Sequence, residues 1–118
     1  MSLAASILIG IVAALHVYFL VLEMVFWDRS LGRRVFGLTP EFAAESKALA
    51  ANQGLYNGFL AAGLVWSLLL GDAGTAIALF FLGCVIVAGI FGAVTVNRKI
   101  LWVQAAPAAL ALAFVLFG

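Results

Sequence analysis

The segment Leu3–Trp27 reads LAASILIGIVAALHVYFLVLEMVFW, an apolar run that contains no lysine or arginine and a single acidic residue, Glu23. A helix needs about 20 mainly apolar residues to cross the ~30 Å hydrocarbon core of a bilayer. Three further segments of this kind follow: Ala50–Leu70, Ala73–Val96 and Ile100–Phe117. The sequence therefore predicts an all-α fold, a bundle of four transmembrane helices.

The composition supports the membrane class. Of the 118 residues, 67% are hydrophobic and only 9% are charged, whereas soluble domains are about half apolar and about a quarter charged. The net charge of +1 gives no field that would attract nucleic acid, so no nucleic-acid partner is expected. The single cysteine, Cys84, excludes an intramolecular disulfide and a multi-thiolate metal site. We expect no metal, and a cysteine that packs as a small hydrophobic residue.

The connections between the segments predict how the helices run. Gly71-Asp72 and Asn97–Lys99 are tight turns, and short turns make neighbouring helices antiparallel. An up-down-up-down bundle in one domain, residues 1–118, follows. In the longer connection Thr39 is a helix cap, Pro40 suits the first helical position and Glu41 faces the positive end of the helix dipole. The second helix is therefore expected to begin near Pro40.

The residues before Pro40 carry the charge. Asp28–Arg34 reads DRSLGRR and is expected to form a charged cytoplasmic loop, followed by an apolar stretch, Val35–Leu38, at the headgroup level. The basic residues all lie in the first and third connections: Arg29, Arg33, Arg34, Lys47, Arg98 and Lys99. Because lysine and arginine concentrate in cytoplasmic loops, we expect a multi-pass protein of the inner membrane with both termini outside. The first segment lacks a positive leader and is expected to be retained.

Small residues recur at helical spacing in the second and third segments. Gly54, Gly58 and Ala62 repeat every four residues, and Gly89 is followed by Ala93 at the same spacing. Small residues at this spacing let helix backbones approach closely in lipid. Two interpretations stay open, packing within the chain and contact between copies in a homo-oligomer.

Polar side chains within the apolar segments indicate a candidate ligand-binding site. His16 and Glu23 are seven residues apart, which places them on one helix face with an axial separation of roughly 10 Å. The second segment adds four residues near its cytoplasmic end, and the fourth segment adds one: Asn52, Gln53, Tyr56, Asn57 and Gln104. Polar groups in lipid are costly and commonly mark sites. We expect a polar pocket that opens to the cytoplasm or to the inner leaflet.

Structural roles explain the same residues without a ligand. Glu23 is close enough to the end of its helix to reach interfacial water or a loop arginine, and His16 suits a core histidine bonded to a carbonyl. The amides could join helices, since such bonds contribute about 0.6 kcal/mol on average. No known catalytic signature occurs, so catalytic residues stay unassigned.

The chain resembles the domain of unknown function 1304 family of small bacterial inner-membrane proteins, and the resemblance covers nearly its whole length. The stretches that carry it are Leu15–Tyr18, Leu22–Met24, Gly32-Arg33, Val35–Phe42, Leu49–Phe59, Cys84–Gly92, Val103-Gln104 and Pro107. The resemblance implies a four-helix membrane fold and no established activity.

A more distant resemblance is to the membrane-associated eicosanoid and glutathione metabolism proteins. It rests on Ala51-Asn52, Tyr56 and Phe59–Ala61. That family implies a trimer of four-helix bundles with outward ends, which binds glutathione from the cytoplasmic side and a lipophilic substrate between helices. By this likeness Asn52 and Tyr56 would line the pocket. The chain departs from the family at Leu55, where an acidic residue is expected, and in a third segment without the arginine and tyrosine of the glutathione site.

Three functions are compatible with these features. The first is a membrane protein that binds a small amphipathic or lipid-like ligand in the cytoplasm-facing pocket. The second is a glutathione-transferase-like membrane enzyme acting on lipophilic substrates, with glutathione as cofactor. The third is a small proton-coupled exporter that uses Glu23. We rank transport last because the outer half of the bundle lacks polar residues for a proton path.

If the polar residues form a pocket, their removal should cost more than the loss of an interface anchor. We expect Glu23→Ala, Asn52→Ala and Tyr56→Ala to impair folding or function more than Trp66→Phe, because a tryptophan near a helix end serves mainly as an anchor. Folding and activity assays of the four variants side by side provide the check. Equal tolerance of all four substitutions would remove the pocket.

Overall fold

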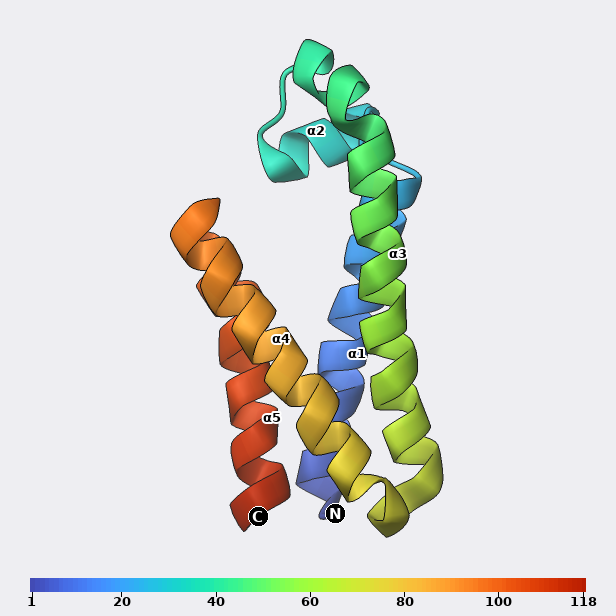
Figure 1. The fold of residues 1–118 in the computed structure, drawn as a ribbon, viewed down its shortest axis with the longest axis vertical. Helices are drawn as coiled ribbons and strands as arrows, with labels where there is room; N and C mark the ends of the chain where they lie inside the picture. The colour runs from blue at the N-terminus through green and yellow to red at the C-terminus, as the bar shows by residue number, and fades with distance from the viewer. The chain divides into compact units, whose positions relative to one another are not determined.

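The computed structural model describes residues 1–118, and the chain is helical throughout without a strand. In chain order the elements are α1 (Leu3–Met24), α2 (Ser30–Phe36), α3 (Pro40–Leu70), the short 3-10 turn η1 (Gly71–Gly74), α4 (Thr75–Thr95), the π-helical turn η2 (Leu101–Ala105) and α5 (Ala106–Phe117). The all-α prediction is confirmed. Figure 1 shows the path of the chain.

The helices divide into two compact units, to which α1 and α3 each contribute a part. Unit 1 comprises residues 1–14 and 60–118, and unit 2 comprises residues 15–59.

Unit 1 is organised around one buried apolar cluster. On α4 the residues that face it, Ala78, Leu82 and Val85, are fully buried and follow the three-to-four spacing of one helix face. The cluster also takes in residues of α1, α3 and α5: Ile9, Val12, Ala13, Leu64, Ala108 and Ala111. Next to the cluster, α4 and α5 run side by side (Figure 1). The chain's two ends lie at the same end of this unit.

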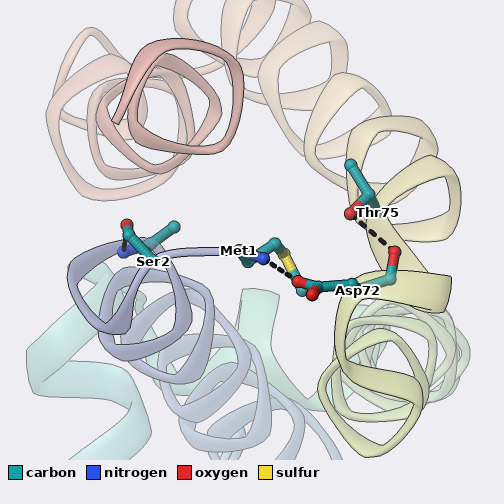
Figure 2. A network of polar contacts seen from close by, with 5 residues as sticks. Met1, Ser2, Asp72 and Thr75 are labelled. Atoms are coloured by element: carbon teal, nitrogen blue, oxygen red, sulfur yellow. Dashed lines mark hydrogen bonds and ion pairs between the residues drawn. The ribbon is translucent and has the colours of Figure 1, made fainter.

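The junction between α3 and α4 in unit 1 is joined to the start of α1. The amino group of Met1 forms an ion pair with the carboxylate of Asp72 (Figure 2). A hydrogen bond from this amino group, reinforced by its charge, lowers the pKa of Asp72. Thr75 Oγ1 donates to the Asp72 carbonyl at 2.9 Å, and Ser2 Oγ accepts from the Ala5 amide at 3.1 Å. These contacts provide partners for polar groups at the helix ends, which lack partners within the helix.

The last helical segment, η2 followed by α5, departs from regular α-helical geometry just before Pro107. In η2 the amide of Ala106 bonds to the carbonyl of Leu101, five residues back. Pro107 follows directly, and a proline has no amide to donate and crowds the carbonyl four residues before it. The wider π-helical turn lies where Pro107 would interrupt the regular hydrogen-bond pattern of an α-helix.

Unit 2 pairs the second half of α1 with the first half of α3. Gly54 lies against α1, where an added Cβ would be 2.6 Å from Met24 Cγ and 3.2 Å from the Leu20 carbonyl oxygen. The predicted start of the second helix is confirmed: α3 begins at Pro40, and Thr39 Oγ1 accepts a hydrogen bond from the Phe42 amide at 3.1 Å. This bond satisfies one of the free amides in the first turn of the helix.

The prediction of a charged loop at 28–34 is wrong in its local structure, because α2 occupies Ser30–Phe36 and lies close to the first turns of α3 (Figure 1). The Phe36 ring packs on Trp27 with centroids 4.9 Å apart. Gly32 is buried against the Phe26 backbone, which leaves no room for a Cβ. Gly37 ends the helix at φ 66°, a left-handed conformation that glycine adopts readily.

The small-residue prediction is partly confirmed. Gly54 and Gly58 face α1 within unit 2, and Gly89 faces the backbone of Ala105 within unit 1. These three glycines therefore serve packing within the chain. Ala62 does not continue the contact face, because it is exposed and the neighbouring Ala61 is buried. Contact between copies stays a prediction.

Two helical stretches are long and apolar enough to cross a membrane, Leu3–Met24 and the run Pro40–Thr95, while Leu101–Phe117 is a shorter apolar helix. This agrees with membrane association by length and composition. The bundle of four transmembrane helices, its sidedness and the single domain stay predictions.

The close contact at Gly89 should be measurable as stability. An added Cβ there would lie 2.6 Å from the backbone nitrogen of Ala105, whereas a Cβ at Gly83 on the same helix meets nothing within 4 Å. We expect Gly89→Ala to lower the free energy of unfolding by about 1–3 kcal/mol. Gly83→Ala should leave it unchanged or raise it by roughly 0.5–1 kcal/mol. Thermal unfolding of both variants in detergent compares them, and equal effects would contradict the packing.

Candidate functional site

The centre of the candidate site is a polar contact between α1 and α3. The side-chain amide of Asn57 donates a hydrogen bond to Glu23 Oε1. Asn57 is buried and Glu23 is half-buried. Their approach depends on Gly54, one turn before Asn57 on the same helix face, since an added Cβ at Gly54 would be 3.2 Å from the Glu23 Cβ. This hydrogen bond offsets the desolvation cost of burying the Asn57 side-chain amide.

The partner of Glu23 tests one of the structural roles expected from the sequence, the pairing with a loop arginine. A loop arginine was one candidate, but the two ion pairs of the chain are Met1–Asp72 and Lys47–Asp28. Glu23 is therefore bonded to an amide on the neighbouring helix. This bond is to Oε1, and the carboxylate has further capacity to accept hydrogen bonds.

His16 lies on the part of α1 that belongs to unit 2. Its side chain is fully buried, and its ring meets the Phe19 ring edge-on with centroids 5.4 Å apart. This burial fits the core histidine that the sequence allowed. A role in ligand binding stays a prediction.

The polar residues on α3 divide between two sides of that helix. Asn52 and Tyr56 are one turn apart and exposed. Because a helix turns about 100° per residue, these two lie on the side opposite Gly54. Gln53 is also exposed, but it is one turn before Asn57 and therefore borders the contact face. The structure brings Glu23 and Asn57 together, with Gln53 adjacent, and it does not bring Asn52 or Tyr56 to that pair.

Gln104 lies in unit 1, where it is half-buried on η2. The residues around Glu23 belong to unit 2. That Gln104 belongs to the same site as the residues around Glu23 stays a prediction.

A second polar cluster in unit 2 was not predicted. Trp27 Nε1 donates to Ser46 Oγ at 3.0 Å, and the Ser46 hydroxyl donates to the Phe42 carbonyl at 2.6 Å. Next to it Lys47 Nζ lies 3.2 Å from Asp28 Oδ2. The signal in the sequence is two pairs of consecutive residues, Trp27-Asp28 after the end of α1 and Ser46-Lys47 near the start of α3. Each member of one pair bonds to a member of the other.

The hydrogen bond from Lys47 lowers the pKa of the Asp28 carboxyl, and the positive charges of Lys47 and Arg29 act in the same direction. The carboxylate is thus held in its charged form at neutral pH, close to the start of α2.

A groove lies along the surface of α4, and it is lined mainly by apolar side chains. A groove of about 710 Å³ is lined by Leu79, Phe80, Gly83, Cys84, Val87, Ala88 and Phe91. Cys84 is half-buried there as a free thiol. None of the polar residues predicted as site members contributes to this groove. No group of three His, Cys, Asp or Glu side chains lies close enough to hold a metal ion.

Comparison with known proteins places the chain among uncharacterised relatives. A family model described as "Protein of unknown function (DUF1304)" matches residues 10–116. An uncharacterized protein, YpaA, from Lactococcus lactis subsp. lactis (strain IL1403) is 32% identical over 114 residues, which cover 95% of this chain and 96% of that protein. No solved structure matches.

The Asp28–Lys47 pair should give a defined pH dependence. A carboxyl with a lowered pKa in the fold stabilises it above the ordinary aspartate pKa of about 4. The stabilisation is lost as the pH falls through the lowered value. In Lys47→Met the pKa of Asp28 should rise towards its ordinary value, and this part of the acid sensitivity should disappear. Carboxyl NMR titration measures the pKa. Lys99→Met is the control, and an unchanged Asp28 pKa in Lys47→Met would contradict the assignment.

Proposed function

The chain belongs to the DUF1304 family of proteins of unknown function, and from this premise we propose that it is an integral inner-membrane protein that binds a small amphipathic or lipid-like ligand from the cytoplasmic side. The ligand's polar head would bind at Glu23 and Asn57.

The apolar surface supports the membrane part of the proposal. Leu69 and Val94 are 80% and 81% exposed, and Phe91 is 69% exposed. Soluble monomers rarely expose large contiguous apolar patches, whereas a bilayer solvates such side chains. The two helical stretches long enough to cross a membrane add to this. The chain's ends lie at one end of unit 1 (Figure 1), as an even number of crossings requires.

The observation that carries the ligand proposal is the half-buried carboxylate of Glu23 between two apolar helices. Ionisable residues within such helices are costly and usually functional. Asn57 donates to Oε1, and the carboxylate can accept further hydrogen bonds, including one from outside the protein. A ligand head that carries a hydroxyl or an amine fits this requirement. The exposed amide of Gln53, one turn from Asn57, would bind a second polar atom of the same head.

Helices α1 and α3, which hold this pair, are apolar over most of their length, and this favours a ligand with an apolar tail that lies along them. Tyr18, Leu55 and Phe59 are about half exposed on these helices (47%, 44% and 54%), but they lie on other sides than Glu23 and Asn57. Asn52 and Tyr56, on the other side of α3, would contact the headgroup layer instead of the ligand head.

Mass spectrometry of small molecules retained during gentle detergent purification tests the ligand. We expect an amphipathic molecule on the wild-type protein and on Glu45→Gln, which makes the same change at an exposed position of α3. Retention should fall roughly tenfold or more in Glu23→Gln, because a hydrogen bond to a charged group contributes about 1.5–3 kcal/mol. Equal retention by the three proteins would contradict the site.

Two added measurements separate the alternative functions. Thermal stabilisation by glutathione but not by unrelated thiols would instead indicate the transferase-like enzyme. Proton-coupled flux in proteoliposomes that disappears in Glu23→Gln would instead indicate the exporter.

A further inference from the structure

The short helix α2 has two faces, and one of them is fixed to the rest of unit 2. Gly32 and Phe36, one turn apart, make the contacts of α2 with the rest of unit 2: Gly32 is buried against the Phe26 backbone, and Phe36, which is 38% exposed, packs on Trp27. Trp27 is itself held by the hydrogen bond to Ser46. These contacts set the rotation of α2 about its own axis, and so they determine which residues face outward.

The outward face combines apolar and cationic side chains. Leu31 and Val35 are one turn apart, and they are 36% and 47% exposed. Arg34 is exposed and follows Leu31 by three residues, which places it beside Leu31 on the helix surface. An exposed apolar pair bordered by an arginine is the composition of helices that lie in the membrane interface.

The positive charge on α2 is not neutralised within the protein. Neither Arg33 nor Arg34 forms an ion pair, since Asp28, the nearest acid in sequence, pairs with Lys47. Glu41 and Glu45 at the start of α3 are exposed and form no ion pair with α2. The guanidinium groups are therefore available to an anionic partner.

The linkage between helices limits where that partner can be. α1 ends at Met24 and α2 begins at Ser30, and the residues between them span at most about 18 Å when fully extended. If α1 crosses the membrane as proposed above, α2 must remain near its surface.

We propose that the outward face of α2 binds anionic phospholipid: Arg34 contacts the phosphate group, and Leu31 and Val35 enter the upper part of the acyl region. This rests on the proposed membrane location. Basic residues near an anionic leaflet gain attraction worth roughly fivefold in affinity per charge. Arginine also matches phosphate geometry with two parallel hydrogen bonds. An acidic protein segment would satisfy the charge but would leave Leu31 and Val35 uncovered.

Trp27 provides the probe, because its ring contacts Phe36 of α2. The full-length chain with Trp66→Phe and Trp102→Phe, which retains Trp27 alone, is reconstituted in mixed vesicles of phosphatidylcholine and phosphatidylglycerol. Either lipid is supplied brominated, and quenching of Trp27 fluorescence gives the relative occupancy of each lipid near α2. We expect phosphatidylglycerol to be preferred roughly fivefold or more, and Arg34→Gln to abolish most of that preference.

Two further variants make the test specific. Arg98→Gln removes the same charge after α4, outside α2, and should leave the lipid preference unchanged. Val35→Ser should weaken quenching by both lipids, because it removes the apolar contact. Equal quenching by the two lipids, or an equal loss of preference in Arg98→Gln and Arg34→Gln, would overturn the proposal and leave the membrane location standing.

Other outcomes have different consequences. Absence of quenching by either lipid would overturn the membrane location of this part of the chain, and the present proposal with it. Binding of a polyglutamate peptide in neutral vesicles that is lost in Arg34→Gln, together with equal lipid quenching, would overturn the proposal in favour of an acidic protein partner.

Discussion

The close approach of α1 and α3 at Gly54 is the contact on which the candidate site depends. A side chain at this position would meet Met24, Glu23 and the Leu20 backbone, so the atoms of α1 would have to shift at this contact. A shift that separates Asn57 from Glu23 would leave a buried amide without its partner. A buried polar group that loses its partner costs about 1–3 kcal/mol. The absence of a side chain at Gly54 thus allows the Glu23–Asn57 hydrogen bond to form between two apolar helices.

Local sequence signals predicted some elements and missed others for identifiable reasons. The start of α3 was predictable because Thr39 and Pro40 act through their own backbone neighbours. α2 was not, because Gly32 within it is a poor helix former, and the contacts that favour the helix come from Phe26 and Trp27 outside it. Tertiary contacts of this kind override local propensity and leave no mark in the segment itself.

The candidate site was likewise predictable only in part from local sequence. Spacing alone grouped the polar residues of α3 into one broad face, but spacing does not say which arc of a helix meets its neighbour. The small residues hold that information: Gly54 and Gly58 mark the side that contacts α1. Asn57 lies on that side, and Asn52 and Tyr56 lie away from it. The angular distance of each polar residue from Gly54 and Gly58 would have made the Glu23–Asn57 contact predictable, and the single pocket stays a prediction.

The π-helical turn before Pro107 has a geometric consequence for α5. A turn closed over five residues accommodates one residue more than a regular α-turn, and at about 100° per residue it rotates everything that follows. Ala105 at the end of the turn and Ala108 and Ala111 after it are buried, and Ala105 lies against Gly89. Larger neighbours such as Leu110 and Phe117 are left on the outside. The π-helical turn therefore rotates α5 about its axis so that its alanine face packs against α4.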